Sequence, residues 1–176
     1  SDDQGNILFY TNGRKIWKGT GASTTLQYSG LLEGNENGAT GNGSAVQGVM
    51  IVRHALDPQT YYIFTTDDAA STSTVGLNYC TVNSNGILIS GPTRLGAYRT
   101  CEGLAATKHQ NGLDLWITTK ATDGNYYTYL LKCNGLNTTP VVSGGGFAPD
   151  NNNKERGGIA FSNNGEYFAA AFDTWW

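Results

Sequence analysis

The sequence predicts an all-β protein made of repeated antiparallel units, and its composition supports this fold class first. Glycine accounts for 24 of the 176 residues and tyrosine for 10, whereas only 14% of the residues are charged. Glycine-punctuated segments rich in Tyr, Thr, Val and Ile favour strands joined by tight turns. No window keeps an apolar period of 3.6 residues for several turns, so very little helix is expected.

The second observation is an internal repeat. One short line of sequence, which passes from a turn into an aromatic-rich or apolar run, occurs four times, and its last residues are 54, 53 and 53 positions apart. The four copies are DQGNILFYT (3–11), DPQTYYIFT (57–65), QNGLDLWIT (110–118) and NNGEYFAAA (163–171). A second line precedes three of them, at 49–54, 104–109 and 158–163, and a third follows at 77–86 and 126–135. The order and spacing of these lines indicate a structural unit of 53–55 residues.

Each unit holds four expected strands. In the third unit these are Gly103–His109, Leu113–Lys120, Tyr126–Lys132 and Pro140–Ser143, separated by Asn-Gly and Asp-Gly turns typical of short hairpins. A four-stranded meander repeated at this spacing is typical of a β-propeller blade. A β-sandwich with coincidental spacing is the alternative. Closed propellers have about 4–8 blades, so residues 1–176 are expected to form part of a single propeller domain of three to four blades.

This hypothesis makes positional predictions. The second lines (49–54, 104–109 and 158–163) should be the innermost strands of successive blades. In the YYIFT line, Tyr62 and Phe64 should face away from Tyr61 and Ile63. The chain is expected to begin on the second strand of one blade, at 6–11, and to stop on the second strand of another, at 166–176. Both terminal blades would then need cover from the rest of a parent polypeptide or from partner subunits, and residues 1–176 alone are not expected to be a stable monomer.

The net charge and the cysteine content argue against several classes of function. The net charge is −3 with a pI near 5.2, and the basic residues are scattered, which argues against a nucleic-acid partner. No apolar stretch approaches the length of a membrane span. Cys80, Cys101 and Cys133 form no metal-binding or redox motif, and no cofactor is predicted. One disulfide with one free thiol and three buried thiols both remain open.

Two resemblances follow from these motifs. FSNNGEYFAAAF (161–172) resembles the FSPDG line of TolB-type and WD40-like propeller repeats. Over nearly the whole chain, five segments are similar to the N-terminal propeller of large surface proteins from gliding Bacteroidota. They are SDDQGNILFYTNGRKIW, AVQGVMIVRHALDPQTYYIFTTDD, GLNYCTVNSNG, EGLAATKHQNGLDLWITT and YYTYLLKCNGL. The resemblance implies type IX secretion, an extracellular or cell-surface location and a role linked to adhesion or gliding motility, without catalytic residues to carry over.

The repeat also points to candidate site residues. Steps of 55 and 54 from Gln47 lead to Glu102 and Arg156, each just before an expected inner strand. Such a ring of amide, acid and guanidinium would bind a polar ligand such as a surface glycan. The structural alternative is that the three residues cap strands and bridge blades through pairing of Arg156 with Glu102.

Other groups point less clearly to chemistry. His54 and His109 occupy matching positions, with Asn163 as the expected third equivalent, so loop hydrogen bonds are favoured over a metal site. The acids lie mostly in turns, and only Glu102 immediately precedes an inner strand. The sequence therefore predicts no catalytic residues and a non-catalytic scaffold or binding module. A propeller-type glycoside hydrolase or a lectin-like module is the alternative, and a structural adaptor that docks other subunits through its side faces is a third.

Overall fold

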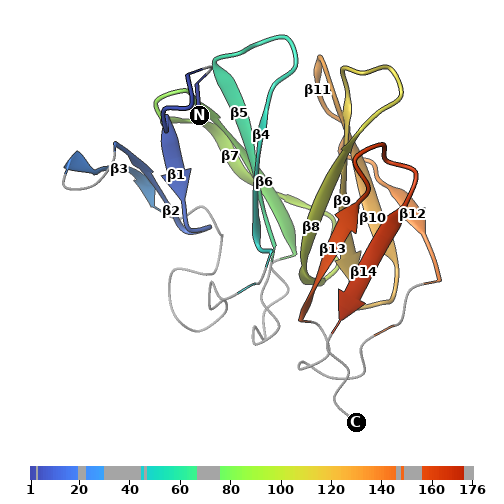
Figure 1. Ribbon diagram of the computed structural model, residues 1–176. Coiled ribbons are helices and arrows are strands. Elements are labelled where there is room, and N and C mark those ends of the chain that lie inside the picture. Colours follow the sequence, from blue (N-terminus) through green and yellow to red (C-terminus); the bar gives the residue numbers. More distant parts are fainter. Residues whose placement is uncertain are drawn as a thin grey trace.

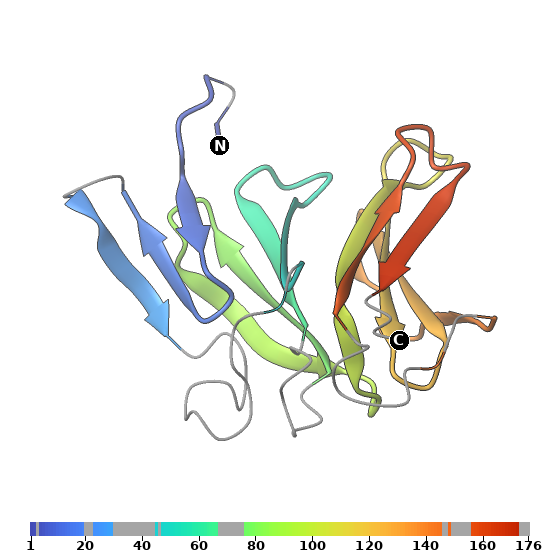
Figure 2. The same ribbon diagram turned by 60° about the horizontal axis from the view of Figure 1, so that its bottom comes forward.

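The computed structural model describes residues 1–2, 4–19, 23–29, 45, 47–66, 76–145, 148 and 156–172. Within these residues the fold is all-β: fourteen strands pair antiparallel in four sheets, and no α-helix is present. Figure 1 shows the sheets following one another in chain order, and Figure 2 shows the same succession from another side. The all-β prediction is confirmed, while no sheet closes on itself.

Each sheet is built from strands adjacent in the sequence. The first sheet contains β1 (Phe9–Thr11), β2 (Lys15–Lys18) and β3 (Thr25–Ser29), and the second contains β4 (Val49–Arg53), β5 (Thr60–Thr65), β6 (Leu77–Asn83) and β7 (Leu88–Leu95). The third contains β8 (Thr100–Lys108), β9 (Leu115–Ala121), β10 (Tyr126–Lys132), β11 (Gly135–Leu136) and β12 (Val141–Ser143), where both β11 and β12 pair with β10. The fourth contains β13 (Gly157–Phe161) and β14 (Phe168–Phe172).

The four strands predicted for the third unit are all present, with two differences. β8 begins at Thr100, before the predicted start at Gly103, because a register shift between Thr100 and Leu104 lets the strand continue through an irregularity. The short strand β11 was not predicted. The second line of the repeat occurs at 49–54, 104–109 and 158–163. These three segments form the first strands β4, β8 and β13 of their sheets.

The repeated line has a physical cause in its turns. At the start of each copy, or one residue before it in the first copy, an Asp or Asn side-chain oxygen accepts the backbone N–H two residues ahead, an arrangement that stabilises a tight turn. The four acceptor and donor pairs are Asp2 with Gln4 at 2.9 Å, Asp57 with Gln59 at 3.0 Å, Asn111 with Leu113 at 3.1 Å and Asn164 with Glu166 at 3.3 Å. In the second, third and fourth sheets, this turn joins the first strand to the second.

The exact register of the repeat differs from the spacing read in the sequence. Arg53 pairs with Tyr61, whereas Lys108 pairs with Leu115, so the hairpin after β4 is one residue longer than the hairpin after β8. Position by position, Thr65 therefore corresponds to Thr119 and not to Thr118. The sequence repeat was aligned on the turn and the following strand together. Such an alignment does not reveal that one of the turns contains an additional residue.

Neighbouring sheets pack face to face through two core clusters. On β5, Tyr61 and Ile63 belong to the cluster shared with Phe9 and Ile16 of the first sheet. Their neighbours Tyr62 and Phe64 belong to the other cluster, which lies between the second and third sheets. The predicted alternation of the YYIFT line is thus confirmed, since successive side chains of a strand point to opposite faces.

The core between the second and third sheets also contains a pair of tyrosines. Tyr129 is fully buried, and its hydroxyl lies 2.6 Å from the Tyr98 hydroxyl. The Tyr98 ring stacks on Tyr127 with 3.8 Å between centroids. Burial raises the pKa of Tyr98 above its ordinary value, and the hydrogen bond to Tyr129 adds to this effect. Both phenols are therefore neutral hydrogen-bonding groups of the core.

Candidate functional site

The three predicted ligand-binding residues occupy different environments. The Gln47 side-chain oxygen accepts the backbone N–H of Ile159 at 2.8 Å and so links the segment before β4 to β13. Glu102 lies in β8 with 2% of its surface exposed, and Arg156 is exposed just before β13. The Gln47 contact is a bridge between two sheets. Ligand binding by these residues stays a prediction.

The strand register also changes which of Gln47, Glu102 and Arg156 occupy equivalent positions in successive sheets. His54, His109 and Ser162 each donate a backbone N–H to the far side of the first hairpin of their sheet, to Thr60, Asp114 and Tyr167 respectively. Counting back from these markers, Arg156 corresponds to Gly103 and not to Glu102. The position that corresponds to Glu102 is residue 155, which lies outside the described residues.

The two histidines, His54 and His109, accept hydrogen bonds from the backbone of the loops that follow them. The Nδ1 atom of His54 accepts the backbone N–H groups of Leu56 at 3.3 Å and Asp57 at 2.9 Å, and Nδ1 of His109 accepts the N–H of Asn111 at 3.2 Å. Their equivalent in the fourth sheet is Ser162, so the predicted equivalence with Asn163 is wrong by one residue. Within the described ranges, no group of three or more His, Cys, Asp or Glu side chains is placed to hold a metal ion.

The first of the two alternatives for the cysteines, one disulfide with one free thiol, is wrong, and the second, three buried thiols, holds for two of the three. Cys80, Cys101 and Cys133 are all free thiols. Cys80 and Cys101 are buried, and Cys133 is partly exposed. Burial raises the pKa of the Cys80 thiol to about 12, which makes the reactive thiolate scarce at neutral pH.

A buried lysine forms a further cluster at the end of β9. Lys120 is 1% exposed, and its Nζ lies 4.9 Å from the ring centroid of Tyr126 and 5.5 Å from that of Phe172. Desolvation lowers the pKa of Lys120. The two aromatic rings compensate part of the lost hydration through cation–π attraction, so this cluster ties β9 to β14.

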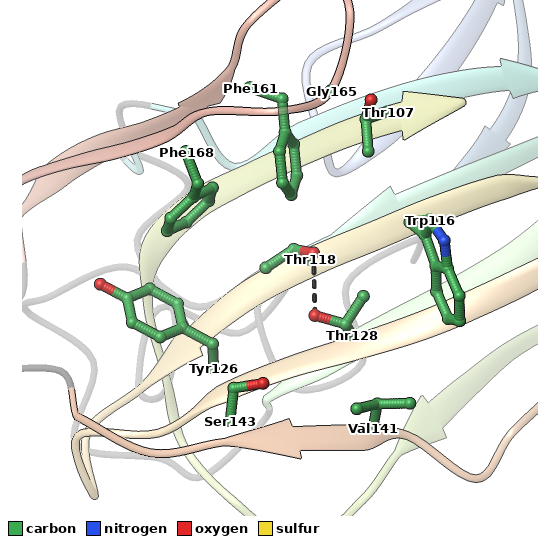
Figure 3. A pocket seen from close by; sticks show the side chains of 10 residues that line it. All are labelled: Thr107, Trp116, Thr118, Tyr126, Thr128, Val141, Ser143, Phe161, Gly165 and Phe168. Atoms are coloured by element: carbon green, nitrogen blue, oxygen red, sulfur yellow. Dashed lines mark hydrogen bonds between the residues drawn. The ribbon is translucent and has the colours of Figure 1, made fainter. Parts of the chain in front are cut away.

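An apolar groove of about 420 Å³ lies between the third sheet and the β13–β14 hairpin. Figure 3 shows Trp116, Thr118, Tyr126 and Thr128 on the third sheet, facing Phe161 and Phe168 of the fourth. The hydroxyls of Thr118 and Thr128 lie 3.0 Å apart and hydrogen-bond to each other. The remaining lining residues are Thr107, Val141, Ser143 and Gly165. Sequence reasoning missed this groove, because no motif marks the face of a sheet that lacks full cover.

A second cavity, of about 440 Å³, lies where the first strands meet. It is lined by residues of β4 and β8, among them Met50 and Lys108, and by Phe161, Ser162 and Asn163 at the end of β13. β8 contacts both β4 and β13. The predicted inner strands therefore do come together on one side of the molecule, with a cavity of mixed polarity at their ends.

Comparison with known proteins yields no relative from which a function is transferred: no protein-family model, no curated protein and no solved structure matches the chain. Among the described residues, no helix is both long and apolar enough to cross a membrane.

Proposed function

We propose that the four sheets are successive blades of a β-propeller, and that this propeller is a non-catalytic binding or scaffold module. The arrangement that supports the propeller is the meeting of β4, β8 and β13 on one side while the sheets pack face to face. Radial stacking of antiparallel meanders produces this combination. A two-sheet sandwich does not, because it has a single core layer between its sheets, whereas the second sheet here has a core cluster on each face.

The proposal that the module is non-catalytic is supported by the placement of its carboxylates. General acid and base chemistry on glycosides needs two convergent carboxyl groups. Asp2, Asp57 and Asp123 accept backbone N–H groups in separate turns. Asp114 accepts the N–H of Cys133 at 3.0 Å and the side-chain amide of Asn111 at 2.9 Å. Most of the described acids are thus structural hydrogen-bond acceptors of turns.

A hydrolysis panel tests this function. Aryl glycosides and peptides incubated with the 176-residue chain are expected to show no turnover above the buffer background. The control is Glu102→Gln, since Glu102 is the described acid nearest to the start of an inner strand. A rate that is present in the unchanged chain and lost in Glu102→Gln would reject the proposal and favour the glycoside hydrolase.

A lectin-like module is the second candidate, because the groove presents aromatic rings, and aromatic rings with a few polar groups are typical of ligand pockets. A glycan array probed with the chain and with Trp116→Ala distinguishes the two. Saturable binding that disappears in the variant would establish the lectin-like function. The scaffold proposal expects no such binding.

The proposed site of action is the outside of a bacterial cell, and it rests on the resemblance to surface proteins of gliding Bacteroidota. Labelling of intact cells with a membrane-impermeant amine reagent tests it. The chain should be labelled without lysis, whereas a cytosolic control protein should not. Labelling only after lysis would refute the location.

A further inference from the structure

Asparagine followed by glycine occurs at seven places in the sequence, and five of these pairs lie in the described part of the chain. Each of the five lies at a turn between two consecutive antiparallel strands. In such a pair the backbone nitrogen of the glycine can attack the side-chain amide carbon of the asparagine, because glycine has no Cβ that obstructs the approach. The five asparagines are Asn12, Asn85, Asn111, Asn134 and Asn164, whereas Asn37 and Asn42 lie outside the described residues.

Hydrogen bonds hold the side chains of Asn111 and Asn164 on both the oxygen and the nitrogen of the amide. Asn111 Oδ1 accepts the backbone N–H of Asp114 at 3.0 Å, and the Asn111 amide donates to the Asp114 carboxylate at 2.9 Å. Asn164 Oδ1 accepts the Ser162 hydroxyl at 2.7 Å, and the Asn164 amide donates to the Glu166 carboxylate at 2.7 Å. Rotation of either amide toward the following glycine therefore breaks at least two bonds.

Asn12 and Asn85 are held through their side-chain oxygens. Asn12 Oδ1 accepts the backbone N–H groups of Arg14 and Lys15, each at 3.0 Å. Asn85 Oδ1 accepts a hydrogen bond from the Lys18 ammonium group. Four of the five asparagine side chains are thus fixed in place.

Asn134, in the turn between β10 and β11, differs from these four. Among the described residues, none donates a hydrogen bond to its side-chain amide or accepts one from it. The turn has room, since a Cβ added at Gly135 would have only the Tyr62 hydroxyl within 4 Å, at 3.9 Å. Exposure does not separate the sites, because all five asparagines are exposed. The Asn134 amide is the one that can turn toward its glycine without losing a bond to a described residue.

We propose that Asn134 is a site of spontaneous deamidation in the folded protein and reacts before the other four. The Gly135 backbone nitrogen forms a bond to Cγ of Asn134, and the bond between Cγ and the amide nitrogen breaks. Ammonia leaves with the proton of the Gly135 N–H, and a cyclic succinimide remains. Water then opens the ring at either carbonyl, which gives aspartate or isoaspartate at position 134. No oxidant or reductant takes part.

The difference in rate comes from the side-chain bonds and not from the glycine. The hairpin holds Gly135 opposite Lys132, and the other turns likewise hold the N–H groups of their glycines, such as that of Gly112, which donates to the His109 carbonyl at 2.9 Å. Freeing the Asn111 or Asn164 amide breaks two or more additional hydrogen bonds, which should slow the reaction at least about tenfold, equivalent to about 1.4 kcal/mol.

Peptide mapping measures this difference. The 176-residue chain is incubated folded in mildly alkaline buffer, digested with trypsin, and each site is followed by mass spectrometry as amide becomes acid. Trypsin separates the three sites to be compared, because Lys120, Lys132 and Arg156 lie between them. Asn134 should react at least about tenfold faster than Asn111 and Asn164. The same chain in concentrated urea is the control: without the turn hydrogen bonds, the three sites should react at similar rates.

A variant tests the protection directly. Glu166→Ala removes the carboxylate that accepts the Asn164 amide, and should speed deamidation at Asn164 by about threefold or more while Asn134 is unchanged. The matched variant Glu166→Gln keeps a side-chain acceptor and should have a smaller effect. Circular dichroism checks that both variants are folded. If Glu166→Ala is unfolded, the comparison of folded and urea-treated unchanged chain decides.

The inference is overturned if Asn134 and Asn111 react equally fast in the folded chain, or if Asn134 keeps the same advantage in urea, which would assign it to the local sequence. An unchanged rate at Asn164 in folded Glu166→Ala would also overturn it. None of these results bears on the hydrolysis panel or the glycan array, so failure of the deamidation site is distinguishable from failure of the proposed function.

Discussion

Removal of the Tyr129 hydroxyl is expected to destabilise the core between the second and third sheets without changing its shape. In Tyr129→Phe the ring remains, and the Tyr98 hydroxyl loses its partner at 2.6 Å. A buried donor left without an acceptor costs about 1–3 kcal/mol. The opposite change, Tyr98→Phe, leaves Tyr129 with the Leu95 carbonyl at 3.5 Å, and should cost about 1 kcal/mol.

The double variant gives the sharper test. When both partners are replaced by apolar groups of the same shape, no donor is stranded, so the loss should be smaller than the sum of the single losses. The expected coupling energy is about 1–2 kcal/mol. Urea unfolding followed by circular dichroism, at one fixed protein concentration for all variants, measures each free energy of unfolding.

The control is Tyr10→Phe, since Tyr10 is 39% exposed and its hydroxyl contacts Thr24 at 3.2 Å near solvent. It should change the free energy of unfolding by no more than about 0.5 kcal/mol. Additive effects of Tyr98→Phe and Tyr129→Phe would show that the two hydroxyls do not interact, and would refute the assignment of this pair as a core hydrogen bond.

Three further changes test the packing and the ionisable groups. Gly86 has φ of 77°, and a Cβ there would lie 3.0 Å from Ile16, so Gly86→Ala should lower the free energy of unfolding by about 1–3 kcal/mol; an unchanged urea midpoint would contradict this. A thiol reagent at neutral pH should label the partly exposed Cys133 well before the buried Cys80, as peptide mapping can show; equal rates would contradict the burial. Burial raises the pKa of Tyr98, and the unfolded phenol, which ionises near pH 10, loses its proton first. Stability should therefore be full below pH 10 and fall above it. Exposed tyrosines such as Tyr167 ionise in the folded chain, but part of the tyrosinate absorbance should appear only as the chain unfolds; full absorbance from all ten tyrosines before unfolding would refute the burial of the phenol.

Several features of this protein follow from the sequence alone because they depend on neighbours along the chain. The Asx turns of Asp57 and Asn111 need only a side-chain oxygen and an N–H two residues ahead. The alternation of Tyr61 and Tyr62 follows from the period of two in any strand. Local physics of this kind predicted the all-β class, the first strands of three sheets and most strand positions.

Tertiary structure decided what depends on distant segments. The one-residue difference between the β4–β5 and β8–β9 hairpins became visible only through strand pairing. The backbone hydrogen bonds of His109 and Ser162 showed separately that Arg156 corresponds to Gly103 and not to Glu102. Gln47 could be read from its spacing as a ligand-binding residue, but its bond to Ile159 depends on two sheets meeting more than a hundred positions apart in the chain. The groove at Trp116 likewise depends on which strands of the fourth sheet lie over β9. Contacts between separate sheets are set by packing across the whole chain, and a local pattern of residues does not contain that information.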